Sequence, residues 1–64
     1  MLTPKEFEVL NLVSKGHPTH VIAEKMGISA YTVEGHRKQL LKKFRAKNSI
    51  DMVRKAMKEK WLKN

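Results

Sequence analysis

Apolar residues recur every three or four positions along most of the chain, which is the period of an amphipathic α-helix. Four such stretches, separated by short polar or glycine-containing connections, predict helices at residues 4–15, 19–26, 30–45 and 49–60. The sequence contains no stretch in which apolar and polar residues alternate as they do in a strand. The pattern therefore predicts an all-α fold, a four-helix bundle in which residues 1–64 form a single domain.

The first two predicted helices have recognisable ends. Thr3 is a suitable N-cap, Pro4 fits the first helical position and Glu6 completes a capping box. Gly16 and Gly27 can adopt the left-handed conformation that ends a helix. The expected core residues of the first helix are Phe7, Val9, Leu10, Leu12 and either Val13 or Ser14, and those of the second are Val21, Ile22, Ala23 and Met26.

The third predicted helix, which Ser29 caps, has two unlike faces. A helical projection gathers Val33, Leu40 and Phe44 on one face, with His36 at its border. The opposite face holds Glu34, Lys38, Leu41, Lys42 and Arg45. We expect the first face to enter the core and the second to be exposed.

The fourth predicted helix, capped by Asn48 or Ser49, has two apolar stripes. Its larger stripe consists of Ile50, Val53, Met57 and Trp61, and we expect it to close the core. We expect the smaller stripe, Met52 and Ala56, to be exposed and to contact the same residues of a second copy.

The length and composition exclude several kinds of protein. A chain of 64 residues buries only about 60% of its unfolded surface, which leaves little room for the enclosed pocket of an enzyme. Without cysteine there is no disulfide and no thiolate zinc site. His17 and His20 flank a proline without a carboxylate at ligand spacing, so we expect no metal and no cofactor. A membrane span and a secretion signal are also missing, and the cytoplasm is the expected compartment.

The net charge of +8, from 14 basic and 6 acidic residues, is unevenly distributed. Residues 1–29 contain three lysines and three glutamates and are neutral overall. Residues 30–48 contain six basic residues and one glutamate, a net charge of +5, and the rest of the chain adds +3. Positive charge concentrated on one element indicates a polyanionic partner. A solvated, lysine-rich surface is the alternative.

A short helix, a tight Gly27-Ile28-Ser29 turn and a longer basic helix form the pattern of a helix-turn-helix motif. A longer set of residues resembles, in order and spacing, the LuxR-type (GerE-type) DNA-binding domains of bacterial transcription regulators. These residues are Leu2-Thr3-Pro4, Glu6, Val9-Leu10, Gly16, Ile22-Ala23, Gly27-Ile28-Ser29, Thr32-Val33, His36 and Lys43. Residues 32–37 are most similar to the output domains of response regulators, which are attached to receiver domains. Attachment to a quorum-sensing domain is the alternative.

The resemblance implies a domain that binds double-stranded DNA as a homodimer, with its third helix in the major groove and its fourth helix at the dimer contact. We assign that contact to Met52 and Ala56. RNA polymerase is a further candidate partner. Two residues depart from the family pattern: His20 stands where a lysine often contacts phosphate, and Phe44 stands where leucine is common. Because histidine is mostly uncharged at neutral pH, we expect a weaker contact at His20, and only altered packing at Phe44.

Glu34, Gly35 and Lys38 are the predicted base-contacting residues. Lys38 can reach a guanine edge or a phosphate, and Glu34 can accept from a cytosine amino group. Glu34 and Lys38 also have the i,i+4 spacing of an ion pair, and this alternative stays open. A glycine inside a helix costs roughly 1 kcal/mol relative to alanine, so Gly35 suggests close approach to the groove.

The predicted phosphate contacts are Thr19, His20, Ser29, Tyr31, Thr32, His36, Arg37 and Lys42. Tyr31 and Thr32 lie at the positive end of a helix dipole, which favours an anion, with simple capping as the alternative. His36 is equally compatible with a packed position at the core border. Lys43 points away from this face, and we expect it to pair with Glu6.

These features together predict a non-enzymatic, sequence-specific DNA-binding module, the output domain of a bacterial transcription regulator. An RNA-binding or general nucleic-acid-binding domain is the first alternative. A protein-interaction module, whose basic helix meets an acidic protein surface, is the second.

Overall fold

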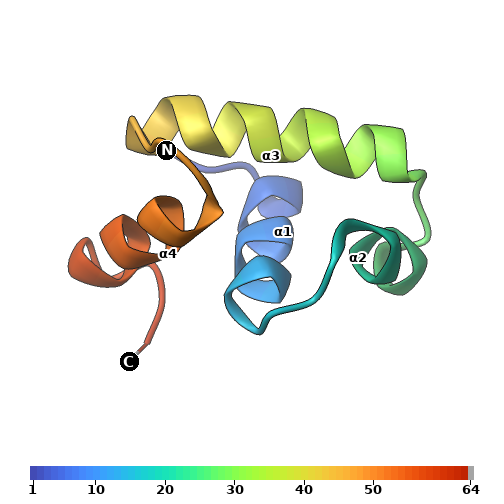
Figure 1. Ribbon diagram of the computed structural model, residues 1–64, viewed down its shortest axis with the longest axis horizontal. Helices are drawn as coiled ribbons and strands as arrows, with labels where there is room; N and C mark the ends of the chain where they lie inside the picture. Colours follow the sequence, from blue (N-terminus) through green and yellow to red (C-terminus); the bar gives the residue numbers. More distant parts are fainter. Residues whose placement is uncertain (64) are drawn as a thin grey trace.

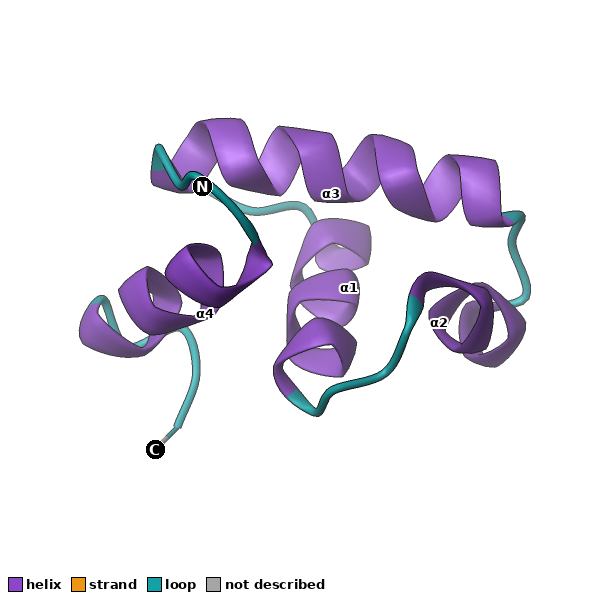
Figure 2. Ribbon diagram, viewed as in Figure 1, coloured by secondary structure: helices purple, strands orange, loops and turns teal. Residues whose placement is uncertain are grey.

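The computed structural model describes residues 1–63 and contains within them the helices α1 (Pro4–Ser14), α2 (Thr19–Met26), α3 (Ala30–Phe44) and α4 (Ser49–Lys58). The longest helix, α3, packs against each of the other three, and α1 lies between α2 and α4 (Figure 1). Figure 2 shows helices and loops but no strand in this part of the chain. The all-α prediction is confirmed. Nothing in residues 1–63 forms a helix with the length and apolarity needed to span a bilayer.

Side chains cap three of the four helix starts. At α1 the Thr3 hydroxyl accepts from the Glu6 N–H (3.1 Å), and the Glu6 carboxylate accepts from the Thr3 N–H (3.0 Å), as the capping box predicts. At α3 the Ser29 hydroxyl accepts from the Thr32 N–H (3.1 Å). Asn48 caps α4, whereas the α2 start has Pro18 as its N-cap and no side-chain hydrogen bond. The first backbone N–H groups of α2 are therefore left to solvent or to a ligand.

All four helices contribute to one apolar core. Its buried residues are Val9, Leu10, Ile22, Ala23, Val33, Leu40, Phe44, Met52, Ala56 and Leu62. The predicted core face of α3, with His36 half-buried at its border, is confirmed. Phe44, the departure from the family pattern, is 6% exposed.

Three helices end slightly earlier than predicted. Lys15 is the C-cap of α1, ahead of the left-handed Gly16 (φ +85°). Arg45 caps α3 with a left-handed backbone (φ +53°), unusual for a residue with a side chain. Beyond α4, Lys60 is left-handed and the Trp61 N–H donates to the Ala56 carbonyl (2.9 Å), which turns the chain so that Leu62 reaches the core.

The prediction for the faces of α4 is wrong. Met52 and Ala56, expected on the surface as a dimer contact, are both 0% exposed and belong to the core of the chain itself. Of the stripe expected in the core, Ile50 is 82% exposed and Met57 is 36% exposed, while Val53 and Trp61 are half-buried. The small side chain of Ala56 lets α4 approach its neighbours closely, whereas the bulkier stripe is left facing outward.

Two smaller expectations are also corrected. Phe7, expected in the core, is 39% exposed because the adjacent Val9 and Leu10 take the inner face of α1. Leu41, expected on the charged face of α3, is half-buried and packs against the core. The apolar face of α3 is therefore wider than the three core positions predicted from the sequence.

Candidate nucleic-acid interface

One side of α3 is turned away from the other three helices, which all lie beneath it in the view of Figure 1. Tyr31, Gly35, Lys38 and Lys42, spaced at four, three and four residues, are exposed along this side. Tyr31 is 89% exposed. Such a row of exposed residues on a straight helix has the shape that fits the major groove of DNA, which admits an α-helix.

The exposed side of α3 is hollowed at its middle. A shallow depression of about 280 Å³ is lined by Tyr31, Glu34, Gly35 and Lys38, and its walls are mainly carbon. It therefore joins all three predicted base-contacting residues with Tyr31. Beyond its two chain neighbours and the nearby backbone of α3, a Cβ atom built on Gly35 would meet no atom within 4 Å, so no other part of the protein fills the space directly above this glycine.

Glu34 links α3 to the start of α2. The Thr19 hydroxyl donates to a carboxylate oxygen of Glu34 at 2.5 Å. The ion pair that Glu34 forms within the described residues is with Arg37, at 3.7 Å, rather than the alternative pair with Lys38. Because Thr19 and Glu34 lie on the two helices of the motif, this hydrogen bond helps to fix the angle between them.

Arg37 lies between α3 and α4. Its guanidinium donates to the Ser49 hydroxyl at the start of α4, and its side chain is only 22% exposed. The same guanidinium faces Glu34. A phosphate contact would require Arg37 to give up these partners, so its position favours a structural link between helices over the predicted phosphate contact.

The other predicted phosphate contacts lie at helix starts or along α3. His20 is exposed in the first turn of α2, beside the uncapped Pro18. Ser29 and Thr32 are exposed at the start of α3, where their hydroxyls lie 2.9 Å apart. Two helix N-termini thus present backbone N–H groups and hydroxyls on the surface, an arrangement suited to anions.

Lys43 joins α3 to the start of α1. Its ammonium donates to Glu6 at 2.7 Å and to the Met1 carbonyl at 2.9 Å, which confirms the predicted pair with Glu6. The Lys43 hydrogen bond, followed by that of the Thr3 backbone, lowers the pKa of Glu6 below its ordinary value. Lys43 is thereby committed to structure and not to the exposed side of α3.

Asp51 organises the start of α4. Its carboxylate accepts from Arg54 (2.7 Å) and from the Lys47 N–H (3.0 Å), and it lies 3.4 Å from the Lys55 ammonium. These partners, Arg54 first and the Lys47 backbone second, lower the pKa of Asp51 from 3.8 to about 2. The Asp51 N–H in turn donates to Asn48 at 2.9 Å.

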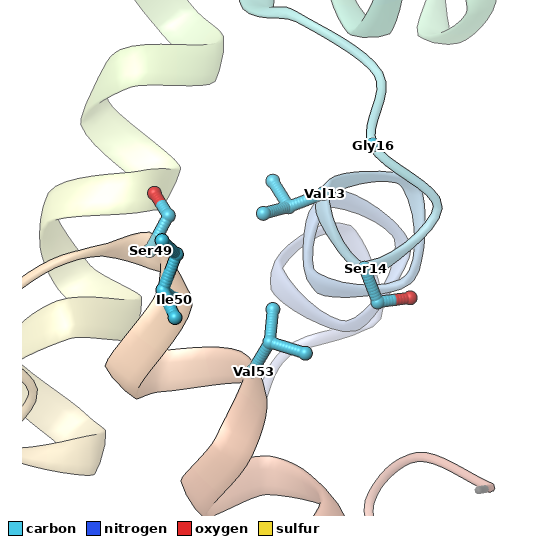
Figure 3. Close-up of a pocket in the computed structure, with 6 residues that line it drawn as sticks. All are labelled: Val13, Ser14, Gly16, Ser49, Ile50 and Val53. Carbon is cyan, nitrogen blue, oxygen red and sulfur yellow. The ribbon is translucent and has the colours of Figure 1, made fainter.

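A second surface feature lies between α1 and α4. An open, mainly apolar hollow of about 250 Å³ is lined by Val13, Ser14, Gly16, Ser49, Ile50 and Val53. Figure 3 shows Val13 of α1 on one side and Ile50 and Val53 of α4 on the other. The exposed stripe of α4 therefore continues onto the end of α1.

Sequence reasoning missed the links made by Thr19, Arg37 and Asp51. The hydrogen bonds of Thr19 and Arg37 span 15 and 12 residues, and no local spacing signals them. Asp51 did have a local signal, because it follows the N-cap Asn48 and an acidic residue in the first turn of a helix interacts favourably with the helix dipole.

Comparison with known proteins places these features in a family. Residues 1–56 match the sequence model for bacterial regulatory proteins of the luxR family. Among curated relatives, the oxygen regulatory protein NreC of Staphylococcus carnosus (strain TM300) is 37% identical over 62 residues, which is 97% of this chain and 29% of NreC. NreC of Staphylococcus aureus (strain JH9) gives the same identity and coverage.

A solved structure of similar shape is described as VqmA bound to DPO. It matches 94% of this chain and 30% of its own with a TM-score of 0.88, at 38% sequence identity. The chain spans less than a third of the length of these relatives. The similarity thus concerns one part of longer regulators.

Proposed function

The chain belongs to the luxR family of bacterial regulatory proteins, whose members are DNA-binding transcription regulators, and on that premise we propose how it binds DNA. It acts as the output domain of a transcription regulator and binds a specific double-stranded sequence with α3 in the major groove. Lys38 and the depression around Gly35 face the bases. The proposal includes residues 1–64 as a single domain that folds by itself, acting in the cytoplasm, where bacterial DNA lies.

The main support is the exposed side of α3. It combines the exposed row Tyr31, Gly35, Lys38 and Lys42 with the most basic segment of the chain, residues 30–48, whose net charge is +5. Lys38 makes no recorded ion pair within residues 1–63, so its ammonium is available for a guanine edge or a phosphate. Glu34 is held by Thr19, and we assign it to positioning the motif as well as to facing the bases.

Lys38→Ala tests this proposal. The loss of one base contact is expected to cost about 1–3 kcal/mol of specific affinity, measured by mobility shift with a duplex selected from a random library. Lys15→Ala is the matched control, because it removes the same charge from the exposed end of α1, which points away from α3 in Figure 1. Equal affinity of the two variants would contradict the assignment. Failure of the parent to shift any duplex at low salt would favour a protein-interaction module.

Phosphate contacts are proposed at the starts of α2 and α3 and farther along α3. The start of α2 has no side-chain cap, so we assign contacts there to His20 and to the backbone N–H of Thr19, whose hydroxyl already donates to Glu34. The start of α3 adds Ser29, Tyr31 and Thr32. Farther along α3, Lys42 is exposed and His36 is half-buried. We leave Arg37 out of this set because it is bound to Ser49 and Glu34.

A dimer on DNA through α4 is also proposed, with a corrected contact surface. Met52 and Ala56 are buried, so we assign the contact to the outward stripe formed by the exposed Ile50 and Met57 with the half-buried Val53 between them. A stripe of this kind on a single helix is small compared with the roughly 1,200 Å² buried in stable interfaces. We therefore expect a monomer in solution that pairs when two half-sites hold two copies together.

Sedimentation and footprinting test the dimer. The free chain is expected to sediment as a monomer, and a selected duplex is expected to show two protected half-sites related by two-fold symmetry. A tight dimer without DNA, or a single asymmetric footprint, would contradict it. RNA polymerase stays a proposed further partner, to which no residue is assigned.

A further inference from the structure

We infer that Gly35 determines base preference through the side chain that it lacks: the depression above it is a subsite for the 5-methyl group of a thymine. This inference rests on the proposed function, because it requires α3 to enter the major groove. It adds a specific occupant to a surface for which the family comparison gives none.

Nothing inside the protein requires glycine at position 35. The glycines with positive φ are Gly16 and Gly27, whereas Gly35 has an ordinary helical backbone. Beyond its two chain neighbours and the nearby backbone of α3, an added Cβ would meet no atom within 4 Å, so packing does not require glycine either. Glycine still destabilises the interior of a helix relative to alanine. The reason for glycine therefore lies in something that approaches the helix from outside.

The depression above Gly35 suits an apolar occupant better than a charged one. Its walls are mainly carbon, and one side is formed by Glu34, whose side chain is 50% exposed. A carboxylate repels a phosphate, so the sugar-phosphate backbone is a poor occupant at this point. In the major groove, the thymine methyl is the apolar group that base pairs present, and it suits a carbon-lined depression.

Lys38 lies beside the depression and forms part of its lining. Its flexible ammonium can reach a base or phosphate next to the thymine while the methyl contacts the Gly35 backbone. A Cβ at position 35 would stand between the helix and that methyl. Base preference at this position is thus expected to depend on both the glycine and the methyl.

The experiment exchanges each partner separately. A duplex is selected with the parent chain, and each thymine is replaced in turn by deoxyuridine, which lacks only the methyl. At one thymine position per half-site, the exchange is expected to lower the affinity of the chain for the duplex about fourfold. This is the value of burying one methylene-sized group. Gly35→Ala is expected to lose about tenfold on the parent duplex and to become insensitive to the deoxyuridine exchange at that same position, which a double-mutant cycle measures.

Stability measurements separate this effect from damage to the fold. Gly35→Ala is expected to raise the melting temperature by about 4–8 °C, because alanine favours the helix and meets open space. A lowered melting temperature would overturn the inference, since the glycine would then be needed within the protein. Unchanged affinity of Gly35→Ala, or no sensitive thymine, would also overturn it.

Lys38→Ala distinguishes this failure from failure of the proposed function. If Lys38→Ala weakens binding while Gly35→Ala does not, α3 contacts DNA and only the thymine subsite is wrong. If the parent binds no duplex, both proposals are wrong.

Discussion

Exchanging single residues on the two sides of α4 gives opposite results if the helix is oriented as described. Met52 is fully buried, and replacing a buried methionine by alanine removes apolar contacts and leaves a cavity, at about 2–5 kcal/mol. Ile50 is 82% exposed, and substitutions at such positions usually change stability by less than about 0.5 kcal/mol. The two variants therefore separate core packing from surface contact on one helix.

The size of the chain makes the Met52→Ala effect easy to measure. At about 0.05–0.15 kcal/mol per residue, 64 residues give a total stability of about 3–10 kcal/mol. A loss of at least about 2 kcal/mol lowers the melting temperature of a domain this small by about 8 °C or more. Thermal and urea unfolding followed by helical circular dichroism measure the loss. Ile50→Ala is expected to melt like the parent.

The variant that is expected to keep its stability, Ile50→Ala, is the one expected to lose cooperative DNA binding. Ile50→Ala is expected to bind one half-site like the parent but to lose cooperativity on a duplex with two half-sites, because Ile50 lies in the proposed dimer contact. Met52→Ala is expected to keep its cooperativity at a temperature where it is folded. The orientation of α4 would be refuted if Ile50→Ala destabilised the chain more than Met52→Ala does.

Three further predictions concern charge, the core and acid stability. If each subunit makes about four phosphate contacts, log K is expected to fall with log salt at a slope of roughly −3 to −4 per subunit; a flat response in filter binding would count against DNA as the partner. Val33→Asp places an unpaired carboxylate at a position that is 0% exposed and is expected to abolish helical circular dichroism, whereas a cooperative melt would show that α3 is rotated differently. Since the pKa of Asp51 is lowered from 3.8 to about 2, its contribution to stability is full above about pH 4 and is lost as the pH falls toward 2. Asp51→Asn is expected to flatten that part of an acid titration, and an unchanged acid profile would contradict the assignment.

Local signals in the sequence predicted most of the fold. The capping box at Thr3 and Glu6, the N-cap Ser29 and the left-handed Gly27 each act over a few residues, so each could be recognised without knowing the tertiary structure. The core face of α3 was also predictable, because its apolar and charged residues lie on opposite sides. These are the elements that place the exposed row of α3.

The orientation of α4 could not be predicted in the same way. Two apolar stripes run along it, and periodicity alone favours the larger one. The choice depends on contacts with other elements, such as the hydrogen bond from Arg37 to Ser49 and the close packing that Ala56 allows. The roles of Thr19 and Arg37 were missed for the same reason, since their partners are distant in sequence.

The left-handed Arg45 at the end of α3 has a consequence for thermostability engineering. A residue with a side chain in this conformation costs about 1–2 kcal/mol compared with one in a right-handed helix, and glycine largely avoids that cost. The guanidinium, however, is placed favourably at the negative end of the helix dipole and adds a cation beside Lys42. Arg45→Gly is therefore expected to make the chain more heat-resistant. The same change removes one positive charge from the end of the helix that we place in the groove.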